Sequence, residues 1–472
     1  MDYFFDRGIM QNFLYRITNI NVVGAFIVAL MALLIGAAMP IYVGLMGSKV
    51  TNLLIPPILL LFVIFLAFDR KLIILAIILF RSVGDVLLNS TKTSIGGMSI
   101  GIGALINIVV LMIALLLVLE KPKLFPKKLA LFWLPFMAIA LFGVVQSPEK
   151  VDAIRTYLTL ISYFAIFIIA VYLVRTPADF NKSIRLVVWS SVIPVIYGIV
   201  DAVLHMRGGS FRLQGTFSHP NIFAFYLVLV ISLSLYLIKT KIAPLKNFGR
   251  FCVSFNMLVM LVQLLLTQTR SAWVACFLIF LFYAIIFERK YLIYLSLLPV
   301  VVLLIPSVRD RLANLDSSNE VYQYAELNSF SWRVSLWESA LRWMEAAKYI
   351  AGYGLDAFPF HSRTFFLKAG AINWGAHNVY IQLIFETGLI GLLSFLALFV
   401  NVARHLRGLF KIEPLGFFIL LSLISEYLVV SASDNTLAYL VFNWYFWFAI
   451  GAGCSLVSLQ FKLTEESTGN TY

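Results

Sequence analysis

The chain has 472 residues, of which 61% are hydrophobic and only 12% are charged. A soluble domain of this size cannot bury so much apolar side chain, so the composition excludes an ordinary soluble protein and indicates one that lies in the lipid bilayer. The net charge of +13 does not predict nucleic-acid binding, because the basic residues are spread thinly over many connecting segments without interleaved aromatic residues.

Apolar runs organise the chain from Val22 to Val457, and each is close to the length of a bilayer-spanning helix. Residues 1–21 lack a short apolar stretch with a cleavage site, so we expect no cleavable signal peptide. Strands are not expected, because the alternation typical of them is absent. We predict an all-α integral membrane protein with about 12 to 14 transmembrane helices. The predicted spans are 22–39, 53–68, 72–88, 99–119, 129–146, 157–174, 186–204, 221–238, 252–268, 271–287, 291–306, 378–403, 414–431 and 436–458.

Basic residues in the connecting segments predict the orientation of these helices. With a cytoplasmic N-terminus, the inward connections hold about eighteen Lys and Arg residues and the short outward ones about seven. Both termini are therefore expected in the cytoplasm. Three parts follow: residues 1–306 with transmembrane helices 1–11, residues 307–376 as a large periplasmic or extracellular loop, and residues 377–472 with helices 12–14 and a cytoplasmic tail.

Two features of the apolar runs are interpreted as structural. Arg81 and Asp85 stand four residues apart, so they can neutralise each other on one helix face. Cys252, Cys276 and Cys454 lie inside apolar runs without metal-ligand spacing, and we predict neither a disulfide framework nor a metal site.

A polar segment after the seventh predicted span contains the first candidate site residues. It reads Arg212-Leu-Gln-Gly-Thr-Phe-Ser-His219-Pro-Asn221, and its proline suits the first turn of the next helix. Arg212 is a candidate functional residue. For His219 two interpretations stay open, a functional group or a helix start.

Arg270 stands in a very tight outward turn, within Thr267-Gln-Thr-Arg270-Ser-Ala-Trp. An arginine with almost no loop to carry it into water needs an anionic partner or a wet cavity, unless it reaches the lipid headgroups. Its planar guanidinium can hold two phosphate oxygens at once.

The predicted large loop contains an amphipathic segment, residues 331–344, whose tryptophans suit a membrane interface. We expect an interfacial helix there, a tight turn at Gly352-Tyr-Gly354, and His361 in a surface loop. The chain re-enters the membrane after His377-Asn378, and Glu386 and Glu426 are ionisable residues within predicted spans.

Taken in order, these motifs resemble those of the O-antigen ligase and O-antigen polymerase superfamily of bacterial polysaccharide assembly, over about residues 185 to 400. The residues that carry the resemblance are the Arg212–Asn221 segment, Thr269-Arg270-Ser-Ala, Arg333 before Leu336-Trp337, Gly352-Tyr-Gly354, and His377-Asn378 followed by Glu386-Thr-Gly-Leu-Ile-Gly391.

The resemblance implies an inverting glycosyl transfer without metal or cofactor, at the outer face of the bacterial cytoplasmic membrane. The implied donor is an undecaprenyl-diphosphate-linked glycan, and the implied acceptor is a lipid-linked glycan or a lipid A core glycan; a chain-length regulator is a possible partner. Arg212 and Arg270 are the catalytic candidates for stabilising the leaving diphosphate, and His377 is the candidate base. The expected substrate-binding residues are Arg333, His219, Asn221, Asn378 and Glu386.

Several functions remain open. Polymerisation is favoured over ligation to a lipid A core or to protein, although the motifs do not separate them. A transporter or flippase of lipid-linked sugars is disfavoured, because the notable arginines lie at outward span ends and no internal repeat is present. A peptidoglycan-polymerising enzyme would use an outer-loop carboxylate, for which Asp310, Asp316 and Asp356 are available without a persuasive motif.

Overall fold

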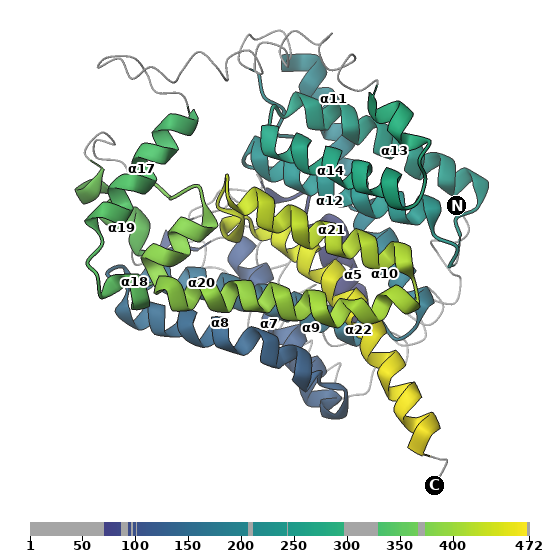
Figure 1. The fold of residues 1–472 in the computed structure, drawn as a ribbon, viewed down its shortest axis with the longest axis horizontal. Helices are drawn as coiled ribbons and strands as arrows, with labels where there is room; N and C mark the ends of the chain where they lie inside the picture. Colours follow the sequence, from purple (N-terminus) through teal and green to yellow (C-terminus); the bar gives the residue numbers. More distant parts are fainter. Residues whose placement is uncertain are drawn as a thin grey trace, which may run out of the picture. The chain divides into compact units, whose positions relative to one another are not determined.

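The computed structural model describes residues 70–85, 93–95, 98–100, 102–205, 211–242, 244–296, 329–366 and 373–469 (Figure 1). The chain forms two compact units, residues 1–113 and 114–472. The all-α class is confirmed, and the protein is a multi-pass membrane protein. Within the described ranges, eight helical segments are long and apolar enough to cross a membrane, and one of them, Pro177–His205, consists of two helices. The predicted spans at 22–39 and 53–68 and most of that at 291–306 lie outside the described residues, and the three-part domain division stays a prediction.

The first unit contains α5 (Arg70–Phe80), a strand pair and the first part of α7 (Ile102–Glu120). Arg81 and Asp85 follow α5 and pair at 3.8 Å, as the sequence predicted. Strands β1 (Thr93–Ile95) and β2 (Met98–Ile100) pair antiparallel in the register Thr93↔Ile100, Ser94↔Ser99 and Ile95↔Met98. The sequence did not predict this pair, and the second strand ends inside the expected span 99–119.

The second unit is built around two helices, α12 (Pro220–Lys239) and α22 (Leu440–Gly469), whose membrane-length parts are buried almost throughout. The three cysteines are free, and Cys276 and Cys454 are buried in the apolar packing. The other elements of this unit are η1 (Pro122–Leu124), α8 (Lys127–Gln146), α9 (Lys150–Leu173), α10 (Pro177–Trp189), α11 (Val192–His205), α13 (Asn247–Leu266), α14 (Arg270–Ile286), α17 (Ser329–Trp343), α18 (Lys348–Ala351), α19 (Ala357–Phe365), α20 (Val379–Leu406), η3 (Arg407–Lys411), α21 (Pro414–Ser431) and η4 (Thr436–Ala438).

The predicted span 186–204 is divided between α10 and α11. Ser190 and Ser191 stand at the break, and their hydroxyls donate to the carbonyls of Val187 (2.6 Å) and Val188 (2.7 Å). Pro194 follows in the first turn of α11, where a residue without a backbone N–H is tolerated. In a continuous helix, the same proline would leave the carbonyl of Ser190 without its donor.

A loop after α18 pairs with a kink in α20, and this contact shapes the region of the candidate site. Gly388 has φ 70° inside α20, and the kink frees two carbonyls from helical bonding. The amides of Tyr353 and Gly354 donate to the carbonyls of Phe385 and Glu386, each at 2.9 Å. A Cβ at Gly388 would lie 2.0 Å from the carbonyl oxygen of Ile350, so the two backbones approach closely because the residue is glycine.

The apolar side of α17 packs on protein. Leu336, Ala340 and Met344 are buried against Phe358 of α19 and Phe385 of α20, and α17, α18 and α19 gather at one end of α20 (Figure 1). Burial of these apolar residues against protein accounts for the amphipathic pattern of the segment. The contact of α17 with a membrane surface stays a prediction.

The predicted loop position of His361 is wrong. The residue lies within α19, and its ring contacts the rings of Trp343 at 5.0 Å and Tyr353 at 5.4 Å between centroids. The residues around it in the sequence form the nine-residue helix α19, which packs on this aromatic cluster.

Candidate functional site

Asp434 is the centre of the candidate site. It lies between α21 and α22, and its side chain is only 2% exposed. Its Oδ1 atom accepts the hydroxyl of Tyr439 (2.5 Å) and the backbone N–H of Asn435 (2.9 Å), and its Oδ2 atom accepts the amide of Asn221. Burial alone raises the pKa of Asp434, but His377, Tyr439 and Asn221 stabilise the carboxylate and hold its pKa below the usual value. A buried carboxylate is thus kept ionised by its donors.

His377 faces this carboxylate. Its Nδ1 atom lies 3.6 Å from Oδ1 of Asp434, and its side chain is 37% exposed. The backbone of His377 has φ 50°, in the left-handed region that is uncommon for residues other than glycine. The ring therefore has one side near a buried anion and remains accessible to a ligand.

Asn378 fixes the backbone beside His377. Its Oδ1 atom caps α20 by accepting from the amides of Tyr380 (2.9 Å) and Ile381 (3.2 Å), and its Nδ2 atom donates to the carbonyl of Ala432 (2.9 Å). This predicted substrate-binding residue thus joins the start of α20 to the Asp434 segment. Its visible role is to position His377.

Arg212 is joined to Asp434 through Asn221. The Nη2 atom of Arg212 donates to Oδ1 of Asn221 (2.8 Å) and to the hydroxyl of Thr269 (3.3 Å), while its Nε atom donates to the carbonyl of Thr267 (3.0 Å). Because Nε and Nη2 bind different partners, the planar guanidinium is held in one orientation. Arg212, Asn221 and Asp434 form a connected polar network from three distant parts of the sequence.

His219 lies next to this network at the start of α12. Its Nδ1 atom accepts the backbone N–H of Asn221 at 3.1 Å, which confirms a helix-start role. Burial lowers the pKa of His219, and nearby Arg212, His377 and Arg333 lower it further against the opposing effect of Asp434. The neutral imidazole needed for this cap is therefore favoured.

Of the other two arginines, one contacts the Asp434 segment and the other stands at a helix start next to the network. Arg333 of α17 donates from Nη1 to the carbonyl of Ser433 at 2.5 Å. Arg270 is the first residue of α14 and is half-buried. It follows Thr269, whose hydroxyl donates to Asn221 at 3.2 Å.

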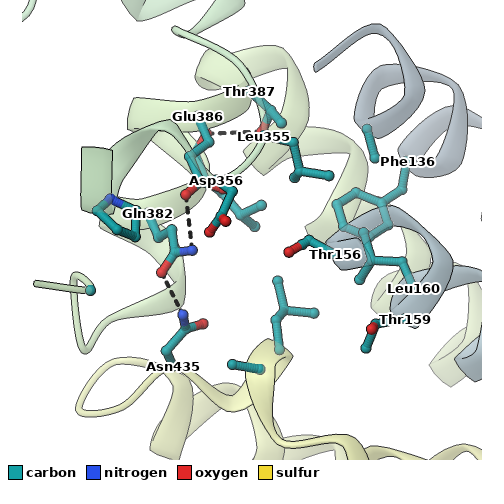
Figure 2. Close-up of a pocket in the computed structure, with 16 residues that line it drawn as sticks. Phe136, Thr156, Thr159, Leu160, Leu355, Asp356, Gln382, Glu386, Thr387 and Asn435 are labelled. Carbon is teal, nitrogen blue, oxygen red and sulfur yellow. Dashed lines mark hydrogen bonds between the residues drawn. The ribbon is translucent and has the colours of Figure 1, made fainter. Parts of the chain in front are cut away.

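A pocket of about 220 Å³ adjoins the Asp434 network, and Glu386 belongs to it (Figure 2). Gln382 donates to Oε1 of Glu386 at 3.0 Å and accepts from the Asn435 amide at 2.5 Å. Since the backbone of Asn435 also binds Asp434, Glu386 is connected to the network by hydrogen bonds.

Sequence reasoning did not name Asp434, Asn435 or Tyr439. Asp434 stands in Ser431-Ala-Ser-Asp-Asn-Thr436, a polar break between two apolar runs. An acidic residue in a very short connection between two apolar runs is the same kind of signal that singled out Arg270. Within the described part of the chain, no three His, Cys, Asp or Glu side chains gather as a metal site requires.

Residues 255–396 match a family model described as O-Antigen ligase. The matched segment begins within α13, ends within α20 and contains Arg270, Arg333, His377 and Glu386. A search of curated proteins gave no match. The matched segment, the motifs and the helical membrane fold together support the similarity of this chain to the O-antigen ligase and polymerase superfamily.

Proposed function

We propose that this chain is a polymerising glycosyltransferase at the outer face of the bacterial cytoplasmic membrane. It moves an undecaprenyl-diphosphate-linked oligosaccharide onto a hydroxyl of another lipid-linked repeat unit. The observation that carries the proposal is the convergence of three residues around the segment 433–435: Arg333 and His377 contact it directly, and Arg212 is linked to it through Asn221. Cations suited to phosphate and an accessible imidazole are what such a transfer needs.

In the proposed reaction, the acceptor oxygen attacks the anomeric carbon of the donor sugar. A new carbon–oxygen bond forms as the bond from that carbon to the diphosphate oxygen breaks, and the electron pair leaves with the diphosphate. Arg212 and Arg270 stabilise the negative charge that develops on the diphosphate, so this scheme requires no metal. Attack opposite the leaving group inverts the anomeric configuration.

The hydroxyl proton passes to His377. Because Nδ1 faces Asp434, Nε2 is the nitrogen assigned to take the proton. Ionised Asp434 favours the tautomer with a proton on Nδ1 and stabilises the imidazolium that forms. Asp434 therefore acts as a positioning residue, and Arg333 is assigned to a second phosphate or to the sugar.

Ligation is the second candidate function, because the matching family model is described as O-Antigen ligase. The same residues would carry the transfer, and the acceptor would be a lipid A core glycan or a protein. The two functions differ in whether the donor lipid also serves as acceptor.

The test incubates purified protein in nanodiscs with the lipid-diphosphate-linked repeat unit alone, with EDTA present, and resolves products by size. A ladder of products is expected from a polymerase. Transfer only after addition of a lipid A core glycan or a protein acceptor would replace polymerisation by ligation. No transfer to any acceptor would contradict both functions and favour a transporter.

A further inference from the structure

The pocket beside Glu386 differs in chemistry from the arginine-rich network next to it. No Lys, Arg or His is among its lining residues. Its oxygen-bearing side chains are those of Thr156, Thr159, Asp356, Gln382, Glu386, Thr387 and Asn435. The rest of the wall is mostly apolar. The pocket thus offers hydrogen-bonding oxygens and carbon surface, whereas the network offers cations.

One lining atom has an unmet hydrogen bond. Oδ1 of Asn435 is buried and has no partner among the described residues, although Nδ2 of the same amide donates to Gln382. Figure 2 shows the side chains of Asn435, Asp356 and Thr156 turned toward the same space. A buried carbonyl oxygen without a donor is unfavourable, so a ligand that brings hydroxyl donors to this space is favoured.

Charge near the pocket disfavours anions. Burial raises the pKa of Asp356, and the negative charges of Asp152 and Glu149 raise it further. These neighbours show that the surroundings of the pocket are acidic. A carboxylate or phosphate bound here would have no cation in the lining to balance it.

Size limits the ligand to one ring. The volume of about 220 Å³ lies below the roughly 300–1,000 Å³ of pockets that enclose drug-sized molecules. Phe136, Leu160 and Leu383 supply flat or apolar wall for the carbon face of a ring. A single pyranose fits these requirements, with hydroxyls for the oxygens and C–H groups for the wall.

We propose that this pocket is a sugar subsite that takes one uncharged pyranose ring of the glycan substrate, with Asn435, Asp356 and Thr156 accepting its hydroxyl donors. The proposal rests on the proposed function for the source of the sugar. Asn435 joins the two parts of the site, since its backbone binds Asp434 and its side chain lines the pocket. Uronic acids are selected against at this position.

The test measures saturation-transfer difference NMR on the purified full chain in nanodiscs, with methyl β-D-glucopyranoside, methyl N-acetyl-β-D-glucosaminide and methyl β-D-glucuronide as probes. Thr156→Leu fills the pocket and Thr156→Val removes only the hydroxyl. Leu158→Ala, at an exposed position of the same helix, is the matched control. His377→Ala separates sugar binding from transfer.

Wild type, Leu158→Ala and His377→Ala are expected to bind at least one neutral glycoside, with the glucuronide at least about fivefold weaker. Thr156→Leu abolishes the signal, and Thr156→Val, which keeps the side-chain shape, weakens binding about three- to tenfold by loss of one hydrogen bond. Equal signals in wild type and both Thr156 variants, or equal binding of the glucuronide, would overturn the subsite. Normal glycoside binding by a protein that transfers to no acceptor would leave the subsite standing and refute the proposed function instead.

Discussion

The Nδ1 atom of His377 lies 3.6 Å from Oδ1 of Asp434, and this contact joins the segment that precedes α20 to the connection between α21 and α22. Three donors already hold that carboxylate in place. The imidazole is therefore oriented by a group that cannot turn away without losing its own hydrogen bonds. Such an arrangement suits a base whose other nitrogen faces a substrate.

Replacing Asp434 by asparagine tests this orientation. Asp434→Asn is expected to lower the rate of glycosyl transfer by about 10²- to 10⁴-fold, because the wrong imidazole tautomer and a lost charge both disfavour proton uptake. The rate is measured by release of undecaprenyl diphosphate. Asp201→Asn is the matched control, since Asp201 pairs with His205 at 2.9 Å in α11; a similar loss in both variants would argue against a specific role for Asp434.

Arg212→Lys tests the fixed guanidinium. Lysine keeps the charge but cannot make the bonds of Nε and Nη2 to Thr267 and Asn221 at once, so transfer is expected to fall at least about tenfold. The assay compares kcat and KM for the lipid-linked donor. Arg342→Lys, at an exposed position of α17, should retain normal rates, and normal kinetics in Arg212→Lys would show that positive charge alone suffices.

Gly388→Ala tests the kink in α20. The added Cβ would meet the carbonyl of Ile350 at 2.0 Å, at a φ of 70°, so we expect a loss of unfolding free energy of about 2 to 4 kcal/mol. Thermal unfolding in detergent measures the loss. Gly249→Ala is the control, because its Cβ would meet only the Leu245 side chain at 3.8 Å; equal melting of both variants would contradict the close backbone contact.

The sequence predicted most of the described spans, because a bilayer requires long apolar helices whatever their tertiary contacts. The sequence also predicted roles for Arg333 and His377, which contact the segment 433–435, and for Arg212, which is linked to that segment through Asn221. Asp434 escaped notice because its partners come from distant positions that no spacing rule connects. The division of α10 from α11 was missed because the apolar composition continues across Ser190 and Ser191.

Glu288 predicts a pH dependence at the junction of α12 and α14. Lys239 (2.6 Å), Lys290 (2.9 Å) and the Tyr283 hydroxyl (2.5 Å) contact its carboxylate. Burial raises the pKa of Glu288, but these contacts outweigh it and lower the pKa from 4.5 to about 2. The ionised form stabilises the fold.

This stabilisation is present above the unfolded pKa of 4.5 and is lost as pH falls toward about 2. The melting temperature of the wild type should therefore fall between pH 6 and pH 2.5, the range in which Glu288 of the unfolded chain becomes protonated. The fall should be smaller in Glu288→Gln, which has no carboxylate to protonate. Glu338→Gln, an exposed carboxylate variant on α17, should keep the wild-type profile. A Glu288→Gln profile identical to that of wild type would refute the linkage.

The most direct test of the central claim is release of undecaprenyl diphosphate coupled to product formation by purified protein supplied with lipid-linked repeat unit. His377→Ala, Arg212→Ala and Arg270→Ala should each abolish both signals while the variants remain folded in membranes, and wild type should release one diphosphate carrier for each glycosidic bond. Wild-type amounts of product from all three variants would contradict the assignment of this site.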